Sequence, residues 1–246
     1  MSVFTNIYLN FSKRRFLKPF KPLSTKKRRN FLISAPTQAA EFVKVIPYVT
    51  GLKKIGPIVM IAPQHHETIC SFIKPKNFQI IFYNIPPLVL SKEYNELKRQ
   101  LSQERFHYIV ELNKPANISL PYLTTTERRF CLYDQTKFPY YNIMLRDNVE
   151  SLCSFFATKK YGAKKIFTFY VRDIKSTMKK YKKKRPLLFV NGTDKIDWQG
   201  NTITIGKDIS SDSPEAYKLL VGADAYSGQH DVFYEFAKIF SKEIIE

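Results

Sequence analysis

The 246-residue sequence has few of the residues that build several familiar kinds of site. Its eight glycines form no G-x-G-x-x-G, G-x-x-x-x-G-K-S/T or G-x-S-x-G pattern, which excludes the glycine-rich nucleotide loops and the nucleophile elbow. Three cysteines, Cys70, Cys131 and Cys153, lie far apart and form no C-x-x-C pair, so they predict reduced core residues in the cytoplasm. No apolar run approaches the roughly 20 residues of a membrane-spanning helix.

Metal ligands and cofactor motifs are scarce as well. His65 and His66 precede Glu67, but the H-E-x-x-H pattern is absent. Because adjacent helical residues point in different directions, we expect a surface pair rather than two ligands of one ion. The sequence predicts no metal site and no cofactor.

One long segment has no acidic residue and another has a single one, and this is the most informative shortage. Residues 1–40 carry nine Lys and Arg and no acid, and residues 159–185 carry twelve against Asp173 alone. Residues 186–246 are acidic, while the whole chain has a net charge of +19. Charge sorted in this way predicts an anionic partner that is contacted at two places. RNA in a ribonucleoprotein assembly is the favoured partner, and an anionic membrane surface or protein subunits of a larger complex are the alternatives.

The cations expected to contact nucleic acid lie in two runs. They are Lys13, Arg14, Arg15, Lys26, Lys27, Arg28 and Arg29 near the start, and Lys179, Lys180, Lys182, Lys183, Lys184 and Arg185 further along. Residues 1–30 are expected to form an extended basic arm, because Pro19 and Pro22 oppose a long helix. A solvated tail, a mitochondrial presequence or a membrane-peripheral segment are the other interpretations of the arm.

Apolar runs alternate with amphipathic stretches after the arm, which predicts a doubly wound, mostly parallel α/β sheet. The expected strands are 31–35, 57–62, 78–83, 107–112, 129–133, 141–145, 187–190 and 202–205. The expected helices are 38–54, 65–73, 91–104, 147–160, 173–181, 215–221 and 231–243. Ser91 and Ser213 are the expected N-caps of two of them. We divide the chain into the arm (1–30), a Rossmann-like domain (31–147), a helical basic connector (148–186) and a smaller C-terminal α/β unit (187–246).

The order of several short motifs resembles glycosyltransferase family 9, the heptosyltransferases with a GT-B fold. The resemblance is carried by Ile33-Ser34-Ala35, by the helix from Ala39 to Lys54, by Gln103–Leu112 and by Arg128–Cys131. The order Asp208–Ser210, Ser213–Leu220 and Ala223-Asp224 resembles the approach to the sugar-nucleotide loop of that family, and Ser227-Gly228-Gln229-His230 resembles the loop itself.

This resemblance implies site residues, and the sequence departs from the family at each of them. Glu41 aligns with the loop Asp that is proposed as the catalytic base of the family, and Ala40 replaces a glycine. Ser227, Gly228 and His230 align with the ligand-binding loop, which here lacks a Pro-Met pair and is one residue short. The second domain is also too short for a complete GT-B enzyme.

These departures predict a non-catalytic, heptosyltransferase-like scaffold that binds an anionic partner, with RNA favoured. One alternative is a compact glycosyltransferase that uses a nucleotide-sugar donor at a membrane face, with Glu41 as the base. The other is a structural subunit of a protein complex.

Overall fold

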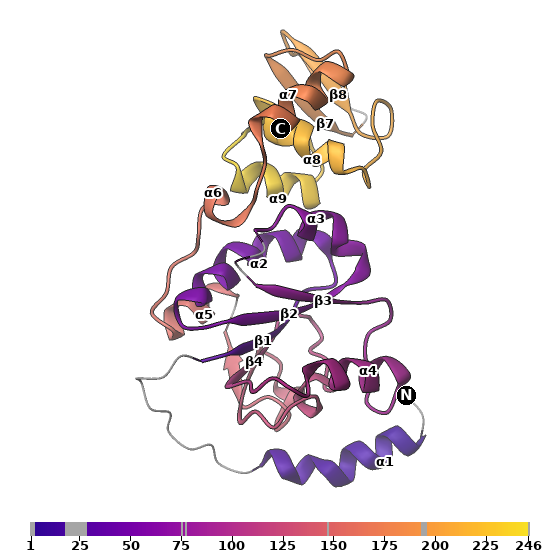
Figure 1. The fold of residues 1–246 in the computed structure, drawn as a ribbon, viewed down its shortest axis with the longest axis vertical. Helices are drawn as coiled ribbons and strands as arrows, with labels where there is room; N and C mark the ends of the chain where they lie inside the picture. The colour runs from indigo at the N-terminus through magenta and orange to yellow at the C-terminus, as the bar shows by residue number, and fades with distance from the viewer. Residues whose placement is uncertain are drawn as a thin grey trace. The chain divides into compact units, whose positions relative to one another are not determined.

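The computed structural model describes residues 3–17, 29–74, 76, 78–146, 148–192 and 196–245. These residues form two compact units, which are treated separately below (Figure 1). The first unit takes its residues from Met1–Thr37, Tyr48–His65 and Pro75–Lys160, and the second from Gln38–Pro47, His66–Lys74 and Tyr161–Glu246. The four segments expected from the sequence stay predictions.

A six-stranded parallel sheet forms the centre of the first unit. Its strands are β1 (Phe31–Ser34), β2 (Ile58–Pro63), β3 (Gln79–Tyr83), β4 (Tyr108–Glu111), β5 (Arg128–Leu132) and β6 (Ile143–Leu145). They are hydrogen-bonded in the order β3-β2-β1-β4-β5-β6, and every pair is parallel. Every residue of β1, β2 and β4 is buried, as expected for strands covered on both faces. The doubly wound α/β fold expected from the apolar runs is confirmed.

Helical elements connect these strands, except for the last element, α5, which follows β6. They are α2 (Ala39–Gly51), η2 (Leu52–Lys54), η3 (Gln64–His66), α3 (Glu67–Ser71), α4 (Lys92–Leu101), η4 (Leu120–Tyr122), η5 (Gln135–Lys137) and α5 (Glu150–Phe155). Ser91 caps α4 as expected, because its hydroxyl accepts a hydrogen bond from the Tyr94 amide at 3.0 Å. The helix expected over 147–160 is shorter, because Ala157 takes a φ of +51° and the chain turns there.

The described part of the N-terminal segment is helical, so the expectation of an extended arm is wrong there. Residues Val3–Ser12 form α1 and Lys13–Phe16 form the 3-10 helix η1. The two prolines that opposed a helix lie beyond this stretch, which itself holds no proline or glycine. The segment packs onto the first unit, since Leu9 and Phe16 are buried and the Ser12 hydroxyl lies 2.8 Å from that of Tyr122.

A smaller four-stranded parallel sheet forms the centre of the second unit. Its strands are β7 (Leu187–Asn191), β8 (Asn201–Thr204), β9 (Ala225–Gly228) and β10 (Glu243–Ile245), in the order β10-β9-β7-β8. Its helices are α6 (Ala163–Ile166), α7 (Val171–Lys180), α8 (Pro214–Gly222) and α9 (Val232–Ile239). Ser213 caps α8 as expected. The helix expected over 231–243 ends earlier, because Ser241 takes a φ of +53° and the chain continues into β10.

Several smaller expectations are decided by burial. Cys70, Cys131 and Cys153 are buried and unpaired, which confirms them as core residues. His66 is fully buried and stacks on Phe42 with 4.5 Å between ring centroids, so the surface position expected for it is wrong. Within the described ranges, no helix is both long and apolar enough to span a bilayer.

Candidate functional site

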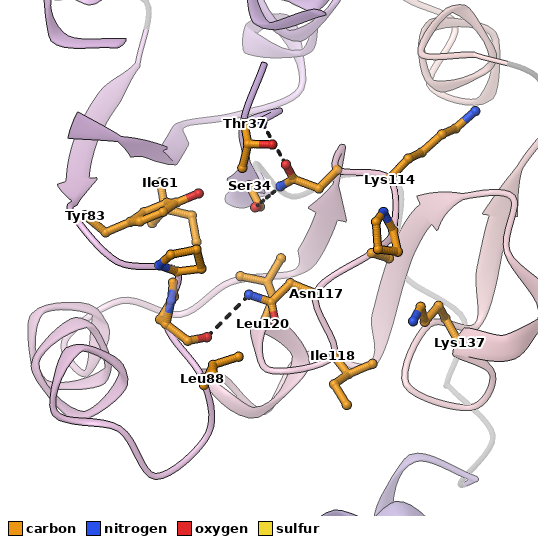
Figure 2. A pocket seen from close by; sticks show the side chains of 15 residues that line it. Ser34, Thr37, Ile61, Tyr83, Leu88, Lys114, Asn117, Ile118, Leu120 and Lys137 are labelled. Atoms are coloured by element: carbon orange, nitrogen blue, oxygen red, sulfur yellow. Dashed lines mark hydrogen bonds between the residues drawn. The ribbon is translucent and has the colours of Figure 1, made fainter. Parts of the chain in front are cut away.

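The strand order of the first unit marks a ligand-binding crevice. The chain runs from β1 through β2 to β3 on one side, and β4 then lies on the other side of β1. In open parallel sheets, ligands bind beyond the carboxyl ends of the strands at such a switch point. A pocket of about 400 Å³ lies there. Its lining residues are Ser34, Thr37, Ile61, Tyr83, Pro86, Pro87, Leu88, Asn113, Lys114, Pro115, Ala116, Asn117, Ile118, Leu120 and Lys137 (Figure 2).

Asn113, directly after β4, fastens the two loops that meet at this crevice. Its side-chain amide donates to the Ser34 hydroxyl at 3.1 Å and to the Ala35 carbonyl at 2.9 Å. Its side-chain oxygen accepts from the Thr37 amide at 2.8 Å (Figure 2). Three hydrogen bonds of one side chain thereby hold the loop after β1 against the loop after β4. The pocket is therefore preformed in the first unit.

A fully buried carboxyl group lies under this arrangement. Glu111, the last residue of β4, accepts on Oε1 from the Asn113 amide at 2.9 Å and from the Asn113 side chain at 2.7 Å. Its Oε2 makes no hydrogen bond with the described residues. Burial raises the pKa of Glu111 to about 7, although the hydrogen bonds from Asn113 act in the opposite direction. The carboxyl is thus poised to exchange a proton near neutral pH.

The pocket wall combines an apolar side with polar groups. Pro86, Pro87, Leu88 and Ile118 supply apolar surface, and Lys114 and Lys137 supply positive charge. Tyr83, from the end of β3, is partly buried, and this burial, together with the charge of Glu111, raises the pKa of its hydroxyl. No Asp, Glu or His is among the residues that line the pocket. This composition suits the binding of a small polar ligand with an apolar face better than acid–base catalysis at the wall itself.

The second sheet has its own switch point, and three expected site residues lie there. β9 and β8 flank β7, so the switch point falls at the carboxyl ends of β7 and β9, where Asn191 and Gly228 are paired. Ser227 is buried, His230 is exposed, and the His230 ring stacks on Tyr234 with 4.0 Å between ring centroids. The structure therefore brings Ser227, Gly228 and His230 together at the edge where ligands bind in such sheets.

Local structure explains two features of this loop without a ligand. Gly228 has a φ of +145°, and a Cβ there would lie 2.2 Å from the carbonyl oxygen of Asn191. Asp231 caps α9, accepting from the amides of Phe233 at 2.9 Å and Tyr234 at 3.2 Å. Only glycine fits the first position, and the helix needs the second.

Glu41, the expected catalytic base, lies in the first turn of α2. Its side chain is 52% exposed and approaches Lys44 at 3.6 Å. An acidic residue in a first helical turn is also favourable to the helix dipole. A catalytic role for Glu41 stays a prediction.

The N-terminal cations are placed differently from one another. Lys13 and Arg14 are exposed, and the Arg15 guanidinium lies 4.3 Å from the ring centroid of Tyr122. Arg29 is only 8% exposed and donates to the Tyr108 hydroxyl at 3.0 Å, so it is built into the first unit rather than offered to a partner. Lys26, Lys27 and Arg28 lie outside the described residues.

Three of the six cations expected at the end of α7 and just beyond it are engaged by acids of the second unit. Lys180 contacts Glu215 at 2.8 Å, Lys183 contacts Asp208 at 3.7 Å, and Arg185 contacts Asp224 at 3.5 Å. The other three expected residues, Lys179, Lys182 and Lys184, are exposed and form no ion pair within the described ranges.

Arg172 and Lys175 are also exposed and form no ion pair within the described ranges, but they were not among the nucleic-acid contacts expected from the sequence. Together with Lys179 they are three and four residues apart on one face of α7. The helical spacing in the sequence could have identified them. We call Arg172, Lys175, Lys179, Lys182 and Lys184 the α7 basic face.

Comparisons with known proteins identify the fold. No family profile and no curated protein sequence matches the chain. Solved structures do match. E. coli ADP-heptose lipopolysaccharide heptosyltransferase II has a TM-score of 0.62 at 11% identity, over 87% of this chain and 83% of that one. A glycosyl transferase family 9 protein of Veillonella parvula has a TM-score of 0.65 at 8% identity, over 91% of this chain and 82% of that one. E. coli heptosyltransferase WaaC has a TM-score of 0.55 at 9% identity, over 87% of each chain.

The chain therefore has the fold of the GT-B glycosyltransferases, with a Rossmann-like first unit and a smaller second sheet. The resemblance to glycosyltransferase family 9 expected from the order of the motifs is confirmed at the level of structure. At sequence identities of 8 to 11%, the similarity to these structures shows a shared fold and nothing about activity.

Proposed function

We propose that the protein is a glycosyltransferase-like scaffold that does not transfer sugar and that binds RNA through the α7 basic face. The observation that carries the proposal is that some of the cations at the end of α7 have acidic partners and their neighbours have none among the described residues. Lys180, Lys183 and Arg185 have acidic partners, whereas the five members of the α7 basic face point into solvent without one among the described residues.

Five unpaired cations on one short helix and its end repel one another. A polyanion relieves this repulsion and releases its own condensed counterions, which is the main source of affinity in non-specific RNA binding. Phosphate contacts of this kind hold the protein in place on the RNA but do not distinguish one nucleotide sequence from another. We place this binding in the cytoplasm, in keeping with three unpaired cysteines.

The test is fluorescence anisotropy of a labelled, structured RNA titrated with the full chain at about 50 and 200 mM salt. If all five cations contact phosphates, log K should fall with log salt with a slope of roughly −3.5 to −4.5. Replacing Arg172, Lys175 and Lys179 by Gln should remove three contacts and reduce the slope by about 2 to 3.

A matched control removes the same charge from the first unit. Lys54, Lys92 and Arg105 are exposed, and replacing them by Gln also removes three positive charges. If this control weakens RNA binding as much as the α7 variant, net charge rather than the α7 basic face is responsible, and the proposal fails. Vesicles with and without phosphatidylserine in a parallel titration report whether an anionic membrane competes for the same face.

The non-catalytic part of the proposal is supported by Glu41. Its half-exposed carboxylate in a pair with Lys44 is an ordinary surface environment, with none of the burial that tunes a general base. Glu41→Ala should leave RNA binding unchanged.

A second candidate, glycosyl transfer from a nucleotide sugar, is favoured by the preformed pocket at the switch point of the first sheet. Its test is calorimetric binding of a nucleotide sugar together with an assay of sugar transfer, each made with the native chain, with Glu41→Ala and with His230→Ala. Binding that needs His230, together with transfer that needs Glu41, would replace the scaffold proposal by the enzyme.

A further inference from the structure

A second pocket lies at the opposite edge of the first sheet, beside the amino end of β5. Its volume is about 460 Å³. The residues that line it are Arg15, Phe16, Lys98, Tyr122, Leu123, Thr124, Thr125, Thr126, Glu127 and Arg129. The lining thus contains three cations, three threonines and one acidic residue. Two of these residues come from η1, so the N-terminal segment completes the pocket.

Arg129 gives this pocket its unusual electrostatics. It is only 5% exposed, and its five N–H groups donate to backbone carbonyls alone. The acceptors are Tyr140 (2.6 Å), Thr126 (3.0 Å), Glu127 (3.0 Å), Phe16 (3.2 Å) and Pro139 (3.3 Å). Among the described residues no carboxylate forms an ion pair with it.

Arg129 is therefore fully hydrogen-bonded, whereas the charge of nearby Glu127 offsets its own charge only in part. Burial, together with the charge of nearby Arg15, lowers the pKa of Arg129 to about 10. A buried charge of this kind is costly unless an opposite charge is nearby, and a bound anion would provide one.

Three other groups are positioned to hold such an anion. The Arg15 guanidinium lies against the pocket wall, with Cζ 4.6 Å from the ring centroid of Phe16 and 4.3 Å from that of Tyr122. Its N–H groups, the Lys98 ammonium and the Thr125 hydroxyl make no hydrogen bond within the described part of the chain. The Phe16 and Tyr122 rings lie at 84° to each other, so contacts with both limit the movement of the Arg15 fork, and a fork held in this way suits bidentate contact with a phosphate.

We propose that this pocket is a phosphate-binding site in which Arg15 and Lys98 contact the phosphate oxygens and buried Arg129 supplies a fixed positive charge beneath them. The site is independent of the α7 basic face, which belongs to the other unit. The phosphate belongs either to a free phosphorylated molecule or to the backbone of the bound RNA, and the chemistry of recognition is the same.

The experiment is calorimetric titration of the full chain with inorganic pyrophosphate at constant ionic strength. Arg15→Gln and Lys98→Gln should each weaken pyrophosphate binding on the order of tenfold, because each removes a charge-assisted contact. Both side chains lie at the surface, so these variants are expected to fold. Lys92→Gln is the matched control, since Lys92 is exposed on the same helix as Lys98 but does not line the pocket.

Three results would overturn the proposal. They are absence of binding to the native chain at millimolar pyrophosphate, native affinity in the double variant Arg15→Gln/Lys98→Gln, and equal weakening by Lys92→Gln. The same double variant in the RNA titration identifies the source of the phosphate. A parallel loss of RNA affinity indicates the RNA backbone, and unchanged RNA affinity with lost pyrophosphate binding indicates a free phosphorylated molecule. The triple α7 variant should keep pyrophosphate binding, so failure of one proposal does not conceal failure of the other.

Discussion

The carboxyl group of Glu111 and the amide of Asn113 form the buried support of the pocket at the first switch point. Asn113 donates to Glu111 Oε1 from both its backbone and its side chain, at 2.9 and 2.7 Å. The same side chain holds Ser34 and Thr37. A charged residue two positions away in sequence thus fixes the side chain that joins the loops after β1 and β4.

Glu111 should make the stability of the protein depend on pH. Because burial raises its pKa in the folded chain to about 7, from the 4.5 of an ordinary Glu, folding favours the protonated form. Its contribution is complete below about pH 4.5 and is lost as the pH rises through about 7. A difference of this size corresponds to roughly 3 kcal/mol of unfolding free energy. Urea unfolding at pH 5 and pH 8 measures it.

Glu111→Gln should remove most of that dependence. The Gln oxygen can accept both hydrogen bonds from Asn113, so stability at pH 5 should change little while stability at pH 8 rises. Glu104→Gln, at an exposed position, is the control and should keep the native pH dependence. A Glu111→Gln variant that is as sensitive to pH as the native chain would show that Glu111 is already ionised in the folded state.

Gly228→Ala should destabilise the second unit strongly. The added methyl group would lie 2.2 Å from the Asn191 carbonyl, at a backbone φ of +145°. A clash with backbone together with strain should cost more than about 2 kcal/mol of unfolding free energy. Gly162→Ala, where a Cβ meets no atom within 4 Å and φ is −75°, should change it by less than about 0.5 kcal/mol. Thermal unfolding of the two variants compares them, and equal midpoints would contradict this account of Gly228.

The sequence predicted much of the fold because buried parallel strands leave a plain signal. The run Ile58–Pro63 is apolar throughout and Phe31–Ser34 is apolar up to its last residue, and the serines that cap α4 and α8 were expected from their residue type. β9 and β10 were missed. Each has only three or four residues, and β9 is a strand because β7 and β10 pair with it on either side.

The candidate sites were harder to predict because they depend on distant contacts. Ser34 and Asn113 are 79 residues apart and meet only because β1 and β4 pair. The acid at the end of the otherwise apolar run Tyr108–Glu111 was the one local sign of this site. In the same way, no pattern in the sequence indicates which of Lys179 and Lys180 has an acidic partner.

Phe16→Ala tests the docking of the N-terminal segment. Phe16 is buried and packs edge-on against Tyr122 and Tyr140, with ring centroids 4.9 and 5.6 Å apart. Its truncation should cost about 3 to 5 kcal/mol of unfolding free energy. Phe11→Ala, at a position that is 83% exposed, should stay within about 0.5 kcal/mol of the native chain. If both variants unfold at the native urea concentration, the segment does not stabilise the first unit.

Adjacent lysines of α7 give the sharpest test of RNA binding. Lys179 is exposed without an acidic partner among the described residues, whereas Lys180 holds Glu215 at 2.8 Å. Lys179→Gln should therefore reduce the salt slope of RNA binding by about 0.7 to 0.9, the value of one phosphate contact. Lys180→Gln removes the same charge but mainly breaks an internal pair, so its slope should stay close to native. Anisotropy at four salt concentrations resolves this difference. Equal effects of the two substitutions would mean that RNA responds to the overall charge of the chain and not to the cations left unpaired on α7.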